Sequence, residues 1–553
     1  MKTQSTPLTI LDYFLKWEKE IPNKVFLKQP YGHSFKEYTW KTVGEEARKV
    51  LGVLQKRGYQ KGDRIALLSA NCAYWMICDI AIMMGGYISI PLYADVNAKT
   101  MRQILDHSES KFLFIGKLNP KDWEQFKDAI PTNVNAACLY GYNKDEVESW
   151  ENFIADTQTP VIHQPMPEEV LTFIYTSGTT GNPKGVIHTN ASIINAIKTA
   201  SAQVELNQLG NRFVSYLPLC HAAERGLIEG GGIYSGGCIS FVETLESFAQ
   251  NVHDQAPTHF FGVPRIWEKI QSKILDKLPQ NRLNLLLKIP LISWYIKNKI
   301  KKSIGLHKAK VILSGAAALS ADLIYWYQSI GVYIREAYGM TENFNVLAMN
   351  PRNDIRPGTV GKLFENQDVK IDPDTQEILQ KCTWQMQGYY KEPEITAQTI
   401  TDGWLHTGDM GKLSNDGFLT VTGRVKDIFK TSKGKYIAPG VIESVFLKSE
   451  SIDQVCVMGS RYAQPFAIVV LSETGASKGK GAIKKEFERI LAEVNKDSMK
   501  HEQIKKVIVV KEEWTNDNQL LTPTLKMKRT ALSEKYEAAL EPLYNSDELV
   551  SWE

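Results

Sequence analysis

Short apolar runs that end in Gly- or Pro-rich loops recur between residues 64 and 318 of the chain. Segments with helical spacing of apolar residues lie between many of them, for example residues 40–56 and 191–203. The apolar runs are "RIALLSAN", "ISIPLYAD", "KFLFIG", "VLTFIYTSG", "RFVSYLPLC", "HFFGVP" and "KVILSGAAA". Repeated strand, loop and helix is typical of an α/β doubly wound sheet, in which ligands bind beyond the carboxyl ends of the strands. We therefore expect this fold class, with the chemistry at those strand ends.

The pattern changes near residue 360. Short alternating strands follow, "VKIDPDTQEILQK" and "GFLTVTGR", and after "GRVKDI" the chain becomes rich in Lys and Glu. This change indicates a smaller α+β unit at the C-terminal end. We place the boundary at about Lys426, between a large domain of residues 1–425 and a small domain of residues 426–553.

The apolar stretch "AYWMICDIAIMMGGYISIPLY", residues 73–93, has the length of a membrane span, about 20 residues. It contains Asp79 and Gly85-Gly86, and it ends in a β-branched run that reaches Pro91. This punctuation favours a buried helix that turns into a buried parallel strand. A membrane span is the alternative.

Residues 283–310, "LNLLLKIPLISWYIKNKIKKSIGLHKAK", contain no acidic residue. Bulky apolar side chains with a Trp-Tyr pair fill the first half, and lysines cluster in the second. This composition is typical of a helix that lies on an anionic membrane surface. The alternative is a pair of helices that pack on the large domain and keep their lysines in water.

Composition and charge narrow the class of protein. The chain has 553 residues, 43% hydrophobic and 23% charged, and 65 Lys and Arg face 62 Asp and Glu. A net charge of +3 does not favour nucleic acid as the partner.

The seven cysteines show neither C-x-x-C nor zinc-ligand spacing, which favours a reducing compartment. Asp12 and Lys16 interrupt the N-terminal apolar residues, so we expect no signal peptide and a cytoplasmic protein. The oligomeric state stays open.

A candidate phosphate-binding loop, "YTSGTTGNPKG", occupies residues 175–185. It is not a Walker A loop, because Asn182 and Pro183 separate Gly181 from Lys184. Glycines let the backbone turn so that its N–H groups converge on an anion, and hydroxyls and an ammonium add donors. These residues are Thr176, Ser177, Gly178, Thr179, Thr180, Gly181, Lys184 and Gly185. A polar surface turn is the alternative.

Further motifs follow in a fixed order. They are "LPLCHAAERG" (217–226), "VPRIWEKI" (263–270), "LSGAAALS" (313–320), "EAYGMTEN" (336–343), "PGTVGK" (357–362), "DGWLHTGDMG" (402–411), "GRVKDIFKTSKGKYIAPGVIE" (423–443) and "LTPTLKMKR" (521–529). In this order and spacing the chain resembles the adenylate-forming superfamily of acyl-CoA synthetases, luciferase-like enzymes and peptide-synthetase adenylation domains. It looks most like long-chain fatty-acid–CoA ligases.

The resemblance implies a large domain of doubly wound α/β subdomains with a small β-barrel-like part, followed by a mobile α+β domain. It also implies a reaction in two steps. A carboxylate attacks the α-phosphorus of ATP and gives acyl-AMP and pyrophosphate, and a thiol then displaces AMP. Two anions meet in the first step, so the site needs cations and N–H donors. The loop at 175–185 would hold the departing β- and γ-phosphates.

Several residues match family positions that bind the nucleotide and metal. Glu342 and Thr180 match the Mg²⁺ ligands, which suits a hard cation that takes few protein oxygens. Asp409 matches the acid that accepts hydrogen bonds from the ribose hydroxyls. Gly315, Ala316 and Ala317 resemble the segment against the adenine, and Tyr338 would stack on its other face. The remaining positions assigned to the nucleotide are Gly339, Met340, Thr341 and Arg424.

Lys526 matches the lysine that enters from the small domain and bridges carboxylate and α-phosphate oxygens. A point charge on a flexible stem suits charge that develops in the transition state. Lys426 matches the hinge position, and His221 matches a histidine at the edge of the acyl pocket. We do not assign His221 as a general base, because an ionised carboxylate needs none.

The sequence departs from the family pattern at several positions. Trp384 lies in a usually small region, Lys433 and Leu525 occupy positions that are commonly glycine, and "GAAA" replaces Gly-Gly-Ala-Pro. None of these changes removes a charged catalytic group.

We therefore predict an ATP- and Mg²⁺-dependent ligase for medium- to long-chain fatty acids. No cysteine lies in a recognisable acyl-acceptor setting, so coenzyme A should supply the thiol. One alternative is a fatty-acyl-AMP ligase that loads a carrier-protein thiol. The other is a non-catalytic nucleotide- or acyl-binding sensor.

Overall fold

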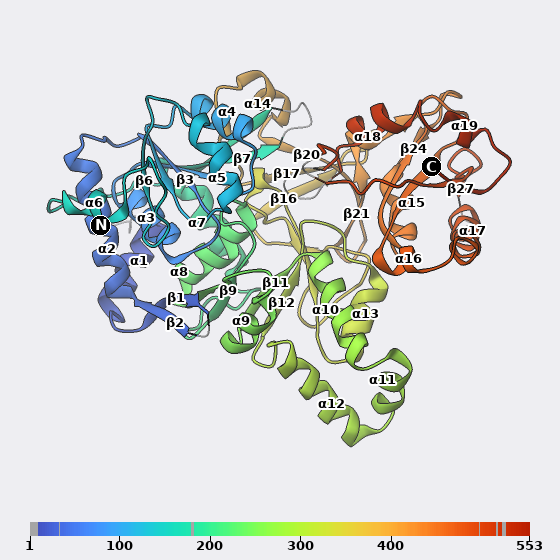
Figure 1. Cartoon of the computed structure of the whole chain (residues 1–553), viewed down its shortest axis with the longest axis horizontal. Coiled ribbons are helices and arrows are strands. Elements are labelled where there is room, and N and C mark those ends of the chain that lie inside the picture. Colours follow the sequence, from blue (N-terminus) through green and yellow to red (C-terminus); the bar gives the residue numbers. More distant parts are fainter. Residues whose placement is uncertain (1–8, 33, 178–181, 497, 516–517, 522–526) are drawn as a thin grey trace.

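The computed structural model describes residues 9–32, 34–177, 182–496, 498–515, 518–521 and 527–553. Figure 1 shows a large body of helices packed around sheets and a smaller lobe formed by the C-terminal residues. All seven apolar runs listed above contain a strand. The mixed α/β class predicted from the sequence is therefore confirmed.

One sheet of the large body is parallel from β7 to β6, in the order β7-β4-β3-β5-β6, and β8 and β18 extend it in antiparallel pairing. Its strands are β3 (Arg64–Leu68), β4 (Ile88–Leu92), β5 (Phe112–Ile115), β6 (Asn135–Cys138), β7 (Val170–Ser177), β8 (Pro183–Thr189) and β18 (Gly388–Tyr389). β7 and β8 flank the candidate phosphate loop, so this loop is the turn of a hairpin rather than a strand-to-helix connection.

A second, larger sheet has the order β16-β17-β20-β21-β15-β14-β13-β12-β11-β9-β10-β1-β2, with β19 paired to β20. The strands from β13 to β1 are parallel. The strands are β1 (Val25–Tyr31), β2 (Ser34–Thr39), β9 (Arg212–Ser215), β10 (Cys238–Phe241), β11 (His259–Gly262), β12 (Val311–Ser314), β13 (Arg335–Tyr338), β14 (Ala348–Met349), β15 (Gly361–Leu363), β16 (Gln367–Ile371), β17 (Glu377–Cys382), β19 (Ile400–Thr401), β20 (Trp404–Leu413) and β21 (Phe418–Arg424).

The strands from β14 to β16 pair antiparallel with one another and continue the parallel sheet. Over the described part of the chain this sheet ends at β16 and β2 and does not close on itself. The barrel-like part expected from the resemblance is therefore an open antiparallel extension. Because it joins β13 directly, it places β20 and β21 beside the carboxyl ends of the parallel strands.

The helices of the large body follow from the apolar spacing and from local caps. α2 begins after Thr39, whose side chain accepts from the N–H of Thr42, and α7 begins with a capping box of Thr189 and Ser192. The helices are α1 (Ile10–Glu20), α2 (Trp40–Lys56), α3 (Ala73–Met84), α4 (Ala98–Ser108), α5 (Pro120–Phe126), α6 (Trp150–Ala155), α7 (Asn190–Ser201), α8 (Gly231–Ser235), α9 (Phe248–Gln255), α10 (Pro264–Lys277), α11 (Gln280–Leu287), α12 (Pro290–Ser303), α13 (Ala321–Ser329) and α14 (Pro393–Thr399).

The apolar stretch at residues 73–93 forms the buried helix α3 and the buried parallel strand β4, as predicted. Apolar residues along α3 belong to one hydrophobic core with residues of both sheets, such as Leu67 and Phe213. Asp79 is fully buried and pairs with Arg225, 2.9 Å away, so its charge has a partner inside the protein. Within the described ranges, no helix is long and apolar enough to span a membrane.

The C-terminal lobe has its own hydrophobic cores, one built from residues between Ile437 and Val550 and one from residues between Cys456 and Tyr544. Its main sheet has the order β24-β25-β26-β27, and β22 pairs with β23. The elements are β22 (Phe429–Lys430), β23 (Tyr436–Ile437), α15 (Pro439–Phe446), β24 (Ile452–Met458), β25 (Phe466–Leu471), α16 (Glu473–Ser477), α17 (Lys480–Lys496), β26 (Val507–Val509), α18 (Arg529–Tyr536), α19 (Glu541–Tyr544) and β27 (Val550–Trp552). The boundary at Lys426 stays a prediction.

Candidate active site

The candidate phosphate loop connects two paired strands. Thr176 lies opposite Lys184 and Tyr175 opposite Gly185, so Thr176 and Lys184 sit side by side at the mouth of the hairpin. Gly178, Thr179, Thr180 and Gly181 lie outside the described residues, as does the side chain of Ser177. The strand register alone therefore places the loop at the carboxyl end of β7.

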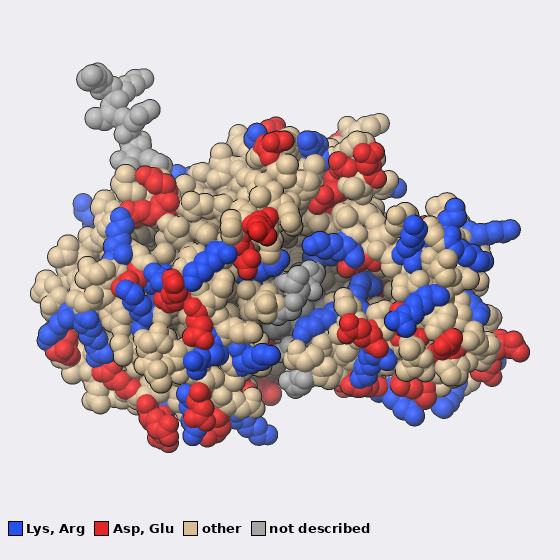
Figure 2. Space-filling view, turned by 90° about the horizontal axis from the view of Figure 1, so that it is seen from above, with Lys and Arg blue, Asp and Glu red and all other residues tan. Residues whose placement is uncertain are grey.

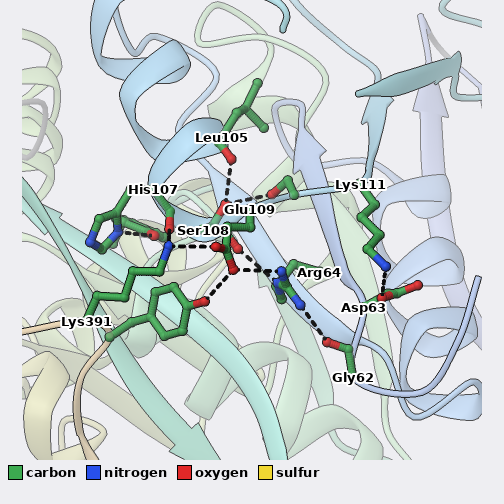
Figure 3. A network of polar contacts seen from close by, with 12 residues as sticks. Gly62, Asp63, Arg64, Leu105, His107, Ser108, Glu109, Lys111 and Lys391 are labelled. Atoms are coloured by element: carbon green, nitrogen blue, oxygen red, sulfur yellow. Dashed lines mark hydrogen bonds and ion pairs between the residues drawn. The ribbon is translucent and has the colours of Figure 1, made fainter. Parts of the chain in front are cut away.

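A polar network holds the base of this hairpin (Figure 3). The hydroxyl of Tyr175 lies 2.8 Å from Nδ1 of His107. Glu109 joins three partners, because its carboxylate contacts Lys391 at 2.9 Å, Arg64 at 3.0 Å and the hydroxyl of Tyr390 at 2.9 Å. Burial, and secondarily the ammonium of Lys391, lowers the pKa of His107, which keeps its ring neutral near pH 7. These contacts hold the residues at the base of the hairpin in place.

Glu342 lies in a 3₁₀ turn, Thr341–Asn343, and is almost fully buried. Its Oε1 accepts a hydrogen bond from the hydroxyl of Tyr389 at 2.7 Å. Its backbone carbonyl accepts from the N–H of Met386 at 2.6 Å. Hydrogen bonds to both the side chain and the backbone of Glu342 therefore hold the turn in place.

A buried histidine also holds this turn. Nε2 of His188 lies 2.7 Å from the carbonyl oxygen of Thr341, to which it donates. Burial lowers the pKa of His188 to about 4, so the ring is neutral and Nδ1 accepts from the hydroxyl of Ser192. Trp384, one of the departures from the family pattern, is fully buried and donates its indole N–H to the carbonyl of Val346 at 2.8 Å.

Three predicted nucleotide-binding residues meet in one cluster. Asp409 on β20 accepts from the hydroxyl of Tyr338 through Oδ2 at 2.7 Å, and its Oδ1 lies 3.0 Å from Nε of Arg424. Asp409 and Arg424 face each other across the β20–β21 pair. Asp409 is buried, whereas the side chain of Arg424 that contacts it is half-exposed to solvent.

The segment predicted to lie against adenine packs closely on its neighbours. A Cβ at Gly315 would lie 3.0 Å from the carbonyl oxygen of Ala337, and one at Gly339 would lie 2.3 Å from the backbone of Asn345. Ala316 has φ of 67°, a left-handed conformation that is uncommon for alanine. Ala316 and Ala317 are exposed, as a segment that covers a ligand requires. Met340 is half-exposed and Thr341 is buried.

An apolar cavity adjoins this segment. It shares Gly315, Ala316 and Gly339 with the nucleotide segments and extends to α7 at Ala196 and Ala200 and to Leu206. A π-helix, Glu224–Gly230, contributes Gly226 to the wall. Such helices frequently occur at functional sites. His221 does not line the cavity but directly precedes two lining residues, Ala222 and Ala223.

The predicted hinge and the predicted catalytic lysine belong to neighbouring segments. Lys426 is exposed in a short 3₁₀ turn, Val425–Asp427. Lys526 lies outside the described residues. Arg529, three residues later, contacts Asp427 at 2.9 Å and Glu443 at 2.7 Å. One guanidinium therefore ties the hinge turn to the segment that follows Lys526.

Sequence reasoning missed three of these residues, Tyr389, His188 and Arg529, as parts of the site. The signal was present in the motifs that contain Gly388-Tyr389-Tyr390 and Lys528-Arg529. Nothing in the sequence showed that Tyr389 contacts Glu342, that Arg529 contacts Asp427, or that His188 contacts the carbonyl of Thr341.

The donor set fits a Mg²⁺ ion held mainly by phosphate oxygens and water. Throughout the described ranges, no group of three or more His, Cys, Asp and Glu side chains has the arrangement of a metal site. Mg²⁺ keeps several waters and commonly takes one or two carboxylates together with substrate phosphates, so a single carboxylate such as that of Glu342 is compatible with the ion.

Figure 2 shows a hollow between the two lobes, with Lys and Arg side chains on both sides of it. A basic rim suits an anionic nucleotide, because opposite charge raises the local concentration of the ligand.

Comparisons with known proteins agree with the motifs. Residues 14–390 match the family described as AMP-binding enzyme, and residues 426–548 match the AMP-binding enzyme C-terminal domain. The long-chain-fatty-acid–CoA ligase FadD15 of Mycobacterium bovis is 28% identical, over 96% of each chain. Fatty acyl-CoA synthetase A of Dictyostelium discoideum is 29% identical, over 92% of this chain and 86% of that one. In fold, the chain is similar to the adenylation domain of the carboxylate reductase from Mycobacterium chelonae, with a TM-score of 0.80 and 21% identity over 98% and 92% of the two chains.

Proposed function

Because this chain belongs to the AMP-binding enzyme family, we propose that it is an ATP- and Mg²⁺-dependent ligase that joins a medium- to long-chain fatty acid to coenzyme A. The reaction passes through acyl-AMP and releases pyrophosphate and AMP. One observation carries the proposal: the apolar cavity and the nucleotide segments share Gly315, Ala316 and Gly339. A carboxylate whose chain fills the cavity therefore ends beside the predicted position of the adenylate. Analysis of the products made from ATP, palmitate and coenzyme A tests this proposal.

The residues divide the first step between them. Lys184 and the 175–185 loop hold the β- and γ-phosphates, Asp409 accepts from the ribose hydroxyls, and Tyr338 presents its ring to the adenine. Arg424, 3.0 Å from Asp409, orients that carboxylate. Glu342 and Thr180 would hold the Mg²⁺ ion, which would supply positive charge against the phosphates. Lys526 stabilises charge on the carboxylate and α-phosphate oxygens during attack.

The second step requires a thiol and a different face of the small domain. The thiol of coenzyme A attacks the acyl carbon and expels AMP. We include in the proposal that residues 426–553 rotate about Lys426 between the two steps. The contact of Arg529 with Asp427 supports coupled movement of the hinge turn and the lysine-bearing segment, since Arg529 follows Lys526 by three residues and its side chain bonds the hinge turn.

Two other functions can be distinguished from the proposed ligase activity. A fatty-acyl-AMP ligase would hand the acyl group to a carrier protein, but no insertion that would hinder domain rotation is evident between Lys426 and Glu443. A non-catalytic sensor would bind nucleotide without turnover. The presence of Glu342, Asp409 and Lys526 in their family positions argues against the sensor.

Chain-length preference should respond to the width of the cavity at α7. We expect Ala200→Phe to lower kcat/KM for palmitate about tenfold or more, because the ring occupies space that distal methylenes need and each methylene contact is worth about 1–3 kcal/mol. Octanoate should be affected much less. Rates for acids from acetate to stearate at fixed ATP measure the profile.

The matched control is Ala202→Phe, at an exposed position just after α7. It should leave the profile unchanged. An equal loss for octanoate and palmitate in Ala200→Phe would remove α7 from the acyl pocket, and a wild-type optimum at acetate or benzoate would contradict the fatty-acid assignment.

We also propose reversible contact with the anionic inner face of a membrane through residues 283–310. α11 and α12 form a hairpin that projects from the large body at the bottom of Figure 1. Large apolar side chains around its turn are exposed to solvent: Leu291 to 84%, Trp294 to 69% and Leu285 to 64%. An apolar patch of this kind marks an interaction site, and a Trp-Tyr pair is typical of a membrane interface.

The positive charge of this hairpin indicates that its partner is an anionic lipid bilayer. No Asp or Glu occurs between Asp276 and Asp322, and lysines follow the exposed apolar residues along α12. Each lysine near an anionic surface contributes about 1 kcal/mol. This contact would raise the substrate concentration at the enzyme, because a long-chain acid is concentrated in the bilayer.

Replacing Lys297, Lys299, Lys301 and Lys302 with Gln should abolish co-sedimentation with phosphatidylserine-containing vesicles. The loss of four such contributions lowers the partition coefficient by about 10²–10³-fold. Activity on detergent-dispersed acid should not change. Added salt should weaken binding of the unmodified protein, because it screens the lysines.

The control replaces four lysines of α17 with Gln, namely Lys480, Lys484, Lys485 and Lys496. It changes the net charge equally and should leave vesicle binding intact. Unchanged co-sedimentation of the α12 variant would exclude this hairpin as the membrane contact.

A further inference from the structure

Tyr389 connects two parts of the site that come from different sheets. Its backbone belongs to β18, which pairs with β8 through Tyr389 and Val186, and the N–H of the next residue, Tyr390, bonds the carbonyl of Gly185 at 2.8 Å. β8 is the strand that leaves the phosphate loop. Tyr389 is therefore fixed to the base of the loop by main-chain pairing.

The side chain of Tyr389 reaches the opposite element. Its hydroxyl donates to Oε1 of Glu342 at 2.7 Å, and Glu342 follows β13 of the larger sheet. The ammonium of Lys184 lies 5.6 Å from the centre of the Tyr389 ring. One phenol thus contacts the carboxylate of Glu342 through its hydroxyl and lies near the lysine of the candidate phosphate loop through its ring.

The type of partner matters for a carboxylate that binds a cation. A Lys or Arg beside Glu342 would fix it but would also cancel the charge that attracts the metal. A neutral hydroxyl fixes one oxygen and leaves the charge in place. Among the described residues, Oε2 of Glu342 has no hydrogen-bond partner, so this oxygen is free to face a ligand.

We propose that Tyr389 is the positioning residue of the metal-binding carboxylate: it holds Oε1 of Glu342 so that Oε2 faces the Mg²⁺ that accompanies ATP. This inference rests on the proposed use of ATP and Mg²⁺ at this site.

The test is Tyr389→Phe, which keeps the ring near Lys184 and removes only the hydroxyl. Affinity for Mn²⁺ is measured by electron paramagnetic resonance in the presence of α,β-methylene-ATP, which cannot transfer its AMP group because a P–C bond replaces the P–O bond that would break. We expect binding to weaken about tenfold, as is typical when a residue that orients a metal ligand is lost. Binding of AMP without metal, measured by calorimetry, should stay the same.

Tyr74→Phe is the matched control. Tyr74, on α3, also donates to a glutamate, Glu46, at 3.4 Å, and it lies outside the site described above. Its Mn²⁺ affinity should equal that of the unmodified protein. The double variant Tyr389→Phe with Glu342→Gln should bind Mn²⁺ no more weakly than Glu342→Gln alone, because the hydroxyl acts only through the carboxylate.

Unchanged Mn²⁺ affinity in Tyr389→Phe would overturn the proposal. So would an equal loss of AMP binding, or an equal effect of Tyr74→Phe, since either result means a general structural role. If the unmodified protein binds Mn²⁺ with the ATP analogue but makes no thioester, the proposed reaction fails whereas the assignment of Tyr389 can still hold.

Discussion

Lys526→Ala is expected to lower the rate of acyl-AMP formation by about 10²–10³-fold or more, the usual cost of removing one group that stabilises transition-state charge. The ammonium is needed while the carboxylate attacks the α-phosphorus, because both reactants are anions. Thioester formation from supplied palmitoyl-AMP and coenzyme A should be largely intact. Palmitate-dependent exchange of labelled pyrophosphate into ATP measures the first step, and the thioester assay measures the second.

Lys528→Ala is the control for this experiment. Lys528 lies two residues away in the same motif, and its ammonium donates to Gln519 at 2.9 Å. Its replacement should change neither step appreciably. Equal losses in both steps for Lys526→Ala would show that this lysine is structural, or that another residue supplies the charge.

Asp409→Ala should lower kcat/KM for ATP by about 10²–10³-fold. The carboxylate is expected to accept two hydrogen bonds from the ribose, and bonds to a charged group contribute about 1.5–3 kcal/mol each. The change also leaves the hydroxyl of Tyr338 and the guanidinium of Arg424 without their partner. Calorimetric titration with AMP should show a comparable loss of affinity.

Asp416→Ala provides the comparison, because Asp416 is an exposed carboxylate between β20 and β21 that pairs with Arg356. It should bind AMP normally. AMP affinity that survives in Asp409→Ala would mean that Asp409 orders the β20–β21 pair without touching the nucleotide.

The sequence predicted the elements of the fold well where burial dictates the residue pattern. A strand covered on both faces reads as a continuous apolar run, and β3, β5, β11 and β12 were found in this way. For residues 73–93 the sequence favoured a buried helix and strand over a membrane span because Asp79, Gly85-Gly86 and the β-branched run to Pro91 interrupt the apolar stretch. In the structure the carboxylate of Asp79 has a buried partner. Arg225, which lies 146 residues away along the chain, is that partner.

The sequence alone did not predict contacts between residues that are far apart along the chain. The hydrogen bond of Tyr389 to Glu342 joins residues 47 positions apart, and their motifs show only that both are present. The meeting of Asp409, Arg424 and Tyr338 depends on the order of strands in the sheet, which the apolar pattern does not encode. The π-helix at Glu224–Gly230 has no periodic signal of its own. The roles of Thr180 and Lys526 rest on their motifs and stay predictions.

Product analysis tests the central proposal most directly. The purified protein is incubated with MgATP, palmitate and free coenzyme A, and nucleotides and acyl products are separated by liquid chromatography with mass detection. Our account predicts one AMP and one palmitoyl-CoA for each ATP consumed, with pyrophosphate released and no reaction when palmitate is omitted. Palmitoyl-AMP that accumulates without thioester would point to a carrier-protein ligase, and bound ATP without any AMP would contradict an enzymatic role.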